Sequence, residues 1–153
     1  MSDTTYLTAL RMLARRELSE TQVRQRLARR RHEPDSIDTA ITRLKADGSL
    51  NDARVAGAMA RSETTLKKRG KLRVKRQIEA AGIAPSVAQH AVDEVFATLD
   101  VEALMAAALA RRLRGREAIA DDREFQRLYR YLIAQGFEAD RVIALLRRHT
   151  KSG

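Results

Sequence analysis

Apolar residues recur at spacings of three and four along almost the whole chain, and helix-breaking residues lie only between such segments. This period is typical of amphipathic helices, whereas the strict alternation of half-buried strands is rare here. We therefore expect an all-α fold. The pattern predicts nine helices, at residues 4–16, 20–31, 36–46, 52–68, 71–81, 85–97, 100–114, 122–135 and 139–149.

Residues that begin and end helices support these boundaries. The segment 19–22, Ser-Glu-Thr-Gln, has the form of a capping box, in which a hydroxyl and an amide satisfy two free backbone groups. Pro34 and Pro85 stand where helices begin, and proline suits the first turn because it needs no amide partner there. Glycines follow three of the apolar runs, as left-handed helix ends require: Gly48, Gly82 and Gly136.

The predicted helices fall into three groups of three, with a period of about 50 residues. One turn position holds Gly82 in the second group and Gly136 in the third, but Arg31 in the first. The groups also align at an apolar residue of the middle helix, which is Val23, Val74 or Leu128. They align again at the first apolar anchor of the third helix, which is Ile37, Val87 or Val142.

This repetition predicts three tandem three-helix repeats, at residues 1–50, 51–98 and 99–153. Each repeat of such an array completes its core against its neighbours, so we expect an elongated, curved molecule with long surfaces rather than one deep pocket. The alternative is a globular bundle whose helices share only a common amphipathic pattern.

The charge is one-sided, with 30 Lys and Arg against 20 Asp and Glu and a formal net charge of +10. Arginine predominates, and its planar fork binds phosphate and carboxylate groups well. An excess of this size favours a polyanionic partner, because binding releases counterions. The alternative is that the charge serves only solubility.

The densest basic stretch is 67–76, in which seven of ten residues are Lys or Arg. Positive charge at a helix start opposes the helix dipole, so Lys71 and Arg73 favour an anionic partner over a merely solvated run. We expect this stretch to contribute most of the binding, through sequence-neutral contacts with the backbone of single- or double-stranded DNA. With related positions on the other middle helices, the predicted binding residues are Arg24, Arg26, Arg29, Arg30, Lys67, Lys68, Arg69, Lys71, Arg73, Lys75, Arg76, Arg127 and Arg130.

Catalytic and metal-binding patterns are missing from the sequence. It has no Cys, and no Cys or carboxylate stands at metal-ligand spacing from His32, His90 or His149. No glycine-rich phosphate loop is present, and no apolar run approaches ~18 residues. We therefore expect a monomeric cytoplasmic binding protein without a cofactor, enzymatic activity or membrane contact.

Three segments resemble the RecX family of bacterial RecA regulators. The first is 48–56, Gly-Ser-Leu-Asn-Asp-Ala-Arg-Val-Ala, followed by Arg61, where the family has Gly-aromatic-Leu-Asp/Asn-Asp-x-Arg-aromatic-Ala. Ser49 and Val55 depart from it, and Lys71-Leu72 replaces a Gly-Pro pair. The other two segments follow in family order: Gly70, Arg73, Ile78-Glu79 and Gly82-Ile83, then Leu128-Tyr129-Arg130-Tyr131-Leu132 and Gly136-Phe137.

The resemblance implies three tandem three-helix repeats and binding along the groove of a RecA nucleoprotein filament. It further implies inhibition of filament growth, strand exchange, ATP hydrolysis and co-protease activity. Two alternatives stand beside it: a sequence-neutral basic protein that coats DNA, and a basic scaffold for an acidic protein.

Two residues of the first matching segment, Asp52 and Arg54, join the predicted partner contacts. Asp52 stands at a predicted helix start, where a carboxylate can cap free amides. Arg54 lies two residues further on and therefore points elsewhere, towards a neighbouring helix. Structural roles for both residues are an equally strong interpretation.

Overall fold

The computed structural model describes residues 2–150 and contains, within them, nine α-helices and no strand apart from one isolated bridge between Ile119 and Thr150. In chain order the helices form three sets of three, as predicted, and their ends agree with the predicted boundaries to within three residues. They are α1 (Ser2–Arg15), α2 (Glu20–Arg29), α3 (Pro34–Ala46), α4 (Asp52–Thr65), α5 (Lys71–Ala80), α6 (Pro85–Ala97), α7 (Val101–Leu113), α8 (Asp122–Gln135) and α9 (Ala139–Arg148).

The predicted helix boundaries rest on the local contacts that the sequence suggested. The Ser19 hydroxyl accepts from the Gln22 amide at 3.1 Å, and the Gln22 side chain accepts from the Ser19 amide at 3.0 Å, which completes the capping box. Gly82 and Gly136 have φ of +84° and +102°. Arg31, which aligns with them, has φ of +65°, so the left-handed turn recurs even where the repeat lacks glycine.

The chain divides into two compact units, and the division runs through the middle set of helices. The N-terminal unit comprises residues up to 58 together with 78–91, and the C-terminal unit comprises 59–77 together with the residues from 92 onward. Helices α4, α5 and α6 therefore each contribute to both units. The repeat boundaries at 50 and 98 stay a prediction.

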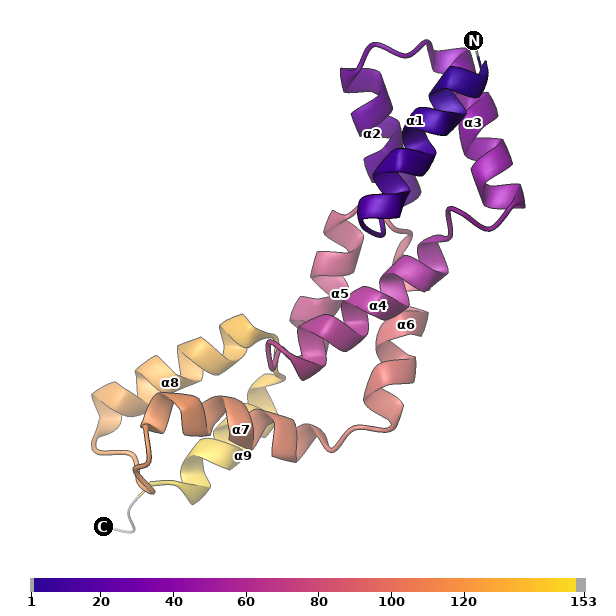
Figure 1. Cartoon of the computed structure of the whole chain (residues 1–153). Helices are drawn as coiled ribbons and strands as arrows, with labels where there is room; N and C mark the ends of the chain where they lie inside the picture. The colour runs from indigo at the N-terminus through magenta and orange to yellow at the C-terminus, as the bar shows by residue number, and fades with distance from the viewer. Residues whose placement is uncertain (1, 151–153) are drawn as a thin grey trace. The chain divides into compact units, whose positions relative to one another are not determined.

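In the N-terminal unit, α1, α2 and α3 pack side by side, with α1 most extensively against α3 (Figure 1). The end of α5 is held on the start of α2, because the Ser19 hydroxyl donates to the Ala81 carbonyl at 2.5 Å and the Thr21 hydroxyl donates to the Gly82 carbonyl at 3.1 Å. The buried core consists of Ala9, Met12, Leu18, Val23, Leu27, Ile37, Ile41, Leu44 and Leu50.

In the C-terminal unit, α7, α8 and α9 pack on one another around a second core (Figure 1). Burial of this many aliphatic side chains, at about 25 cal/mol per Å² of apolar surface, is the main force that holds the three helices together. The core consists of Leu104, Met105, Ala108, Leu109, Leu113, Ile119, Leu128, Leu132, Phe137, Val142, Leu145 and Leu146.

One predicted repeat position needs correction. The third helix of each set buries its fourth residue, which is Ile37 in α3, Ala88 in α6 and Val142 in α9. The prediction chose Val87, which is only half-buried, because valine is the more apolar neighbour. The helix start at Pro85 sets the register, and the smaller Ala88 fills the core position.

Candidate partner-binding surfaces

Two cations of the first part of the central basic stretch share one carboxylate. Lys67 and Arg69 both contact Glu63, with N–O distances of 3.2 Å and 2.5 Å, and the Glu63 side chain is only 13% exposed. Between them Lys68 has φ of +55°, so the chain turns here after α4 ends at Thr65. The charges at 67 and 69 therefore stabilise a turn.

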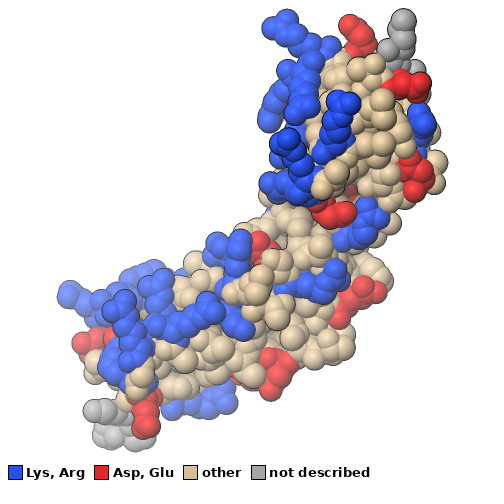
Figure 2. All heavy atoms as spheres, viewed as in Figure 1, with Lys and Arg blue, Asp and Glu red and all other residues tan. Residues whose placement is uncertain are grey.

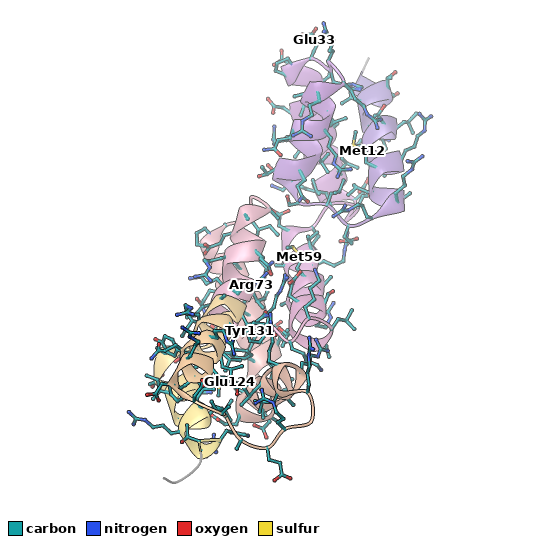
Figure 3. The ribbon with its side chains drawn as sticks, turned by 90° about the vertical axis from the view of Figure 1, so that its left-hand side faces the viewer. Met12, Glu33, Met59, Arg73, Glu124 and Tyr131 are labelled. Atoms are coloured by element: carbon teal, nitrogen blue, oxygen red, sulfur yellow. The ribbon has the colours of Figure 1, made fainter. Side chains whose placement is uncertain are left out.

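The second part of the stretch is also engaged within the C-terminal unit. The Lys71 ammonium lies 2.9 Å from the Asp93 carboxylate. The Arg73 guanidinium donates to the Ala134 carbonyl at 3.2 Å and to the Gln135 side chain at 3.4 Å, and Figure 3 labels this arginine on α5 beside α8. A cation at the end of α8 satisfies carbonyls that have no partner within the helix.

Backbone contacts fix the start of α5 against the end of α8. The Gly70 amide donates to the Gln135 carbonyl at 2.7 Å, and the Leu72 amide donates to the Gly136 carbonyl at 3.1 Å. The positive start of α5 thus faces the negative end of α8. This arrangement explains basic residues at a helix start without an external anion.

Within residues 2–150, Lys68 and Arg76 are the predicted residues of this stretch whose side chains form no ion pair or hydrogen bond. Two large apolar side chains stand exposed at this part of the C-terminal unit: Leu66, just before the stretch, is 72% exposed, and Leu72, within it, is 48% exposed. The available surface here is therefore mixed, with apolar side chains between basic ones.

The basic residues predicted on α2 divide into two kinds. Arg24 lies 3.0 Å from Glu20 and 2.6 Å from Asp38. The hydrogen bond with Asp38, and then that with Glu20, raises the pKa of Arg24, whereas Lys45 and Arg24 lower the pKa of Glu20. Arg24 is thus part of an intramolecular charge network that also includes Lys45, at 3.0 Å from Glu20.

Arg26 and Arg30, by contrast, line a groove of about 220 Å³ between α1 and α2. Its other charged residues are Arg11, Arg15 and Arg16, and Met12 completes the lining. We call this groove, with the five arginines that line it, the α1–α2 arginine groove. None of them forms an ion pair with an acidic residue of the described chain, and Figure 2 shows Lys and Arg side chains gathered over α1 and α2.

Arg26 and Arg30 were predicted from the sequence, but Arg11 and Arg15 of α1 and Arg16, which follows it, were not. A signal was present, because neither Arg11 nor Arg26 has an acidic residue three or four positions away. Arg29, also predicted, is exposed at the end of α2 but does not line the groove.

The predicted residues of α8 lie near a strong ion pair. The two terminal guanidinium nitrogens of Arg116 donate to the Glu124 carboxylate, at 2.9 Å and 2.7 Å, and Arg127 lies 3.8 Å from the same carboxylate. The bond with Arg116, assisted by the Ala120 amide, lowers the pKa of Glu124 to about 2. Arg130 is exposed and forms no ion pair within residues 2–150.

Asp52 and Arg54 both have local partners, and the free amide that Asp52 caps belongs to another helix than its own. Asn51 caps α4, through a bond from the Arg54 amide at 3.1 Å. The Asp52 carboxylate instead accepts from the Glu20 amide at 2.8 Å and so caps α2. The Arg54 guanidinium lies 3.1 Å from Glu17 and donates to two carbonyls of the 48–49 turn, so its partners lie in loops and not in the neighbouring helix that was predicted.

A further cavity, of about 240 Å³, lies in the C-terminal unit between Phe96, Phe137, Lys71 and Arg141. Among residues 2–150 no group of three or more His, Cys, Asp or Glu side chains is arranged to hold a metal ion. None of the helices in that range is both long and apolar enough to cross a membrane.

Comparisons with known proteins agree with this architecture. A family model described as the first three-helix domain of RecX matches residues 6–44, which cover most of α1, α2 and α3. Regulatory protein RecX of Halorhodospira halophila is 35% identical over 137 residues, covering 89% of this chain and 82% of that protein. The chain belongs to the RecX family. Regulatory protein RecX of Chromohalobacter salexigens is 33% identical over 136 residues, with coverage of 88% and 85%.

A solved structure supports the fold. The crystal structure of RecX from Lactobacillus salivarius matches with a TM-score of 0.78 and covers 95% of this chain and 94% of that one. At 19% identity, this likeness concerns the fold alone. The helical repeat array and the regulatory family are therefore established, and the two relatives bear the name of regulatory proteins.

Proposed function

We propose that this protein is a negative regulator of the RecA recombinase, acts on the RecA–DNA filament and has no catalytic activity of its own. It binds in the filament groove and blocks filament growth, and thereby suppresses strand exchange, ATP hydrolysis and co-protease activity. The observation that carries this proposal is the identity to RecX regulators over nearly nine-tenths of the chain.

The surfaces of the two units are compatible with a partner that is part protein and part nucleic acid. Exposed Leu66 and Leu72 offer apolar contacts of the kind that protein interfaces use. The α1–α2 arginine groove offers uncompensated positive charge, which suits phosphate. A filament of RecA on DNA presents both kinds of surface.

The second candidate is a basic protein that acts only by coating DNA, and the unpaired arginines favour it. The two candidates differ in stoichiometry. A filament regulator inhibits RecA when far fewer copies are present than are needed to cover the DNA, whereas a coating protein inhibits only at saturation and loses affinity steeply as salt rises.

The test is a titration of this protein into single-stranded-DNA-dependent ATP hydrolysis by the RecA of the same organism, at fixed DNA. The proposal requires inhibition well below one copy per RecA, with little effect of excess competitor DNA. Inhibition that begins only when the DNA is saturated supports the coating protein instead. A variant with Leu66→Ser and Leu72→Ser tests the apolar contacts, and Leu7→Ser is its control because Leu7 is similarly exposed, at 49%.

A further inference from the structure

The five arginines of the α1–α2 arginine groove have no internal counter-charge, although carboxylates are available in the same unit. Those carboxylates pair with other basic residues: Arg24 with Asp38, Arg43 with Asp3 and Lys45 with Glu20, at 2.6, 3.1 and 3.0 Å. The groove is thus the place where the N-terminal unit concentrates positive charge and excludes negative charge.

Helix stability does not account for this concentration. The dipole favours basic side chains in the last turn, which covers Arg15 in α1 and Arg26 in α2. Arg11 lies a turn earlier, and Arg11 and Arg15 stand four residues apart on one helix face, where like charges repel. The same spacing relates Arg26 to Arg30. A ligand that binds several guanidinium groups at once explains why both like-charged pairs are present.

We propose that the α1–α2 arginine groove binds the phosphodiester backbone of nucleic acid. Each i,i+4 pair has its two Cα atoms about 6 Å apart along the helix axis, and the two pairs together offer donors to more than one phosphate. The inference deepens the proposed function, since it rests on a filament that contains DNA and assigns the contact with DNA phosphate to this groove.

The lining of the groove favours phosphate over an acidic protein segment. Its only apolar lining residue is Met12, which is 5% exposed, so it offers no apolar anchor to a protein partner. It also lacks an aromatic ring for base stacking, and Tyr6 of the same unit is covered by the Arg43 guanidinium at 3.8 Å. Binding is therefore directed to the backbone and indifferent to sequence.

The test measures fluorescence anisotropy of labelled oligo-dT with the full chain, without RecA, across a series of salt concentrations. Arg26→Gln/Arg30→Gln removes two groove arginines. Arg111→Gln/Arg123→Gln is the matched control, because it removes the same charge from exposed arginines of the C-terminal unit. Circular dichroism verifies that both variants are folded.

We expect the groove variant to bind at least about tenfold more weakly at low salt, and the slope of log affinity against log salt to fall by about 0.7 for each lost phosphate contact. The control loses much less. Arg11→Gln/Arg15→Gln should reproduce the groove variant, because it removes the facing pair.

Equal weakening of both double variants overturns the inference, since net charge alone would then govern binding. Unchanged affinity of the groove variant also overturns it. If that variant keeps DNA affinity but no longer inhibits RecA, the groove binds protein carboxylates, and the proposed function survives without this inference. If wild-type protein fails to inhibit RecA while the groove variant loses DNA affinity, the proposed function fails and the groove assignment stands.

Discussion

The contact between Gly70 and Gly136 joins the start of α5 to the end of α8 and makes a sharp prediction about stability. A Cβ atom on Gly136 would lie 2.4 Å from both the amide nitrogen and the Cβ of Arg73, and φ at Gly136 is +102°. A Cβ atom on Gly70 would lie 2.5 Å from the Gly136 carbonyl carbon and oxygen. Backbone atoms on both sides leave no flexible side chain to move away.

The expected cost of Gly136→Ala has two parts. The left-handed backbone costs a residue with a Cβ atom about 1–2 kcal/mol. Overpacking against fixed backbone adds about 1–3 kcal/mol. We therefore expect a loss of roughly 2–5 kcal/mol in the free energy of unfolding, and each kcal/mol lowers Tm by about 2–4 °C in a protein of this size.

Two further variants separate these parts. Gly115→Ala has only the backbone cost, because φ is +87° and no atom lies within 4 Å of the added Cβ. Gly70→Ala has the steric cost, about 1–3 kcal/mol. Urea denaturation followed by circular dichroism measures all three. The double variant at 70 and 136 should cost less than the sum, because the first substitution already opens the contact. A Gly136→Ala variant that is no less stable than Gly115→Ala refutes the packing argument.

Further substitutions test three local contacts. Asp52→Ala removes the cap of α2 and should lower the free energy of unfolding, measured by urea denaturation, by about 0.5–2 kcal/mol. Asp52→Asn keeps an acceptor and should lower it less. Equal stability of the wild type and both variants contradicts the cap. The contribution of Glu124 is complete above its ordinary pKa of 4.5 and is lost as pH falls towards about 2. Glu124→Gln should therefore flatten the decline of Tm with acidity in that window, and an unaltered decline argues against the lowered pKa. Arg73→Glu should destabilise by about 1 kcal/mol or more, while Arg76→Glu changes stability by less than about 0.5, as thermal denaturation will measure.

The helices could be predicted from the sequence because the residues that determine each helix lie close together along the chain. Spacings of three and four set the helices, and caps, prolines and glycines set their ends. The largest error lies at α4, predicted to continue to residue 68 but ending at Thr65. Lysine and arginine are good helix formers, so the sequence does not signal the turn that Lys68 makes with φ of +55°.

The candidate site could be predicted only in part, because charge density along the chain differs from charge available on the surface. The pair of Glu63 with Lys67 could have been read from its i,i+4 spacing. The partner of Lys71 could not, because Asp93 follows twenty-two residues later and is brought to it only by the tertiary structure of the C-terminal unit. Likewise, the arginines of α1 become part of a site only because α1 packs beside α2.

The difference between charge along the chain and charge available on the surface determines which residues should contribute binding free energy towards a polyanion. A basic side chain without an internal partner that binds phosphate gains the full entropic term from counterions released by the nucleic acid, whereas one that must first leave a carboxylate exchanges one ion pair for another. Lys67, Arg69 and Lys71 belong to the second kind, and Arg73 would in addition leave the carbonyls that end α8. The densest basic segment of the sequence therefore serves mainly to hold its own unit together. Arg11 and Arg26 have no acid three or four residues away, and the α1–α2 arginine groove brings them around one opening together with Arg15, Arg16 and Arg30, none of which forms an ion pair within residues 2–150.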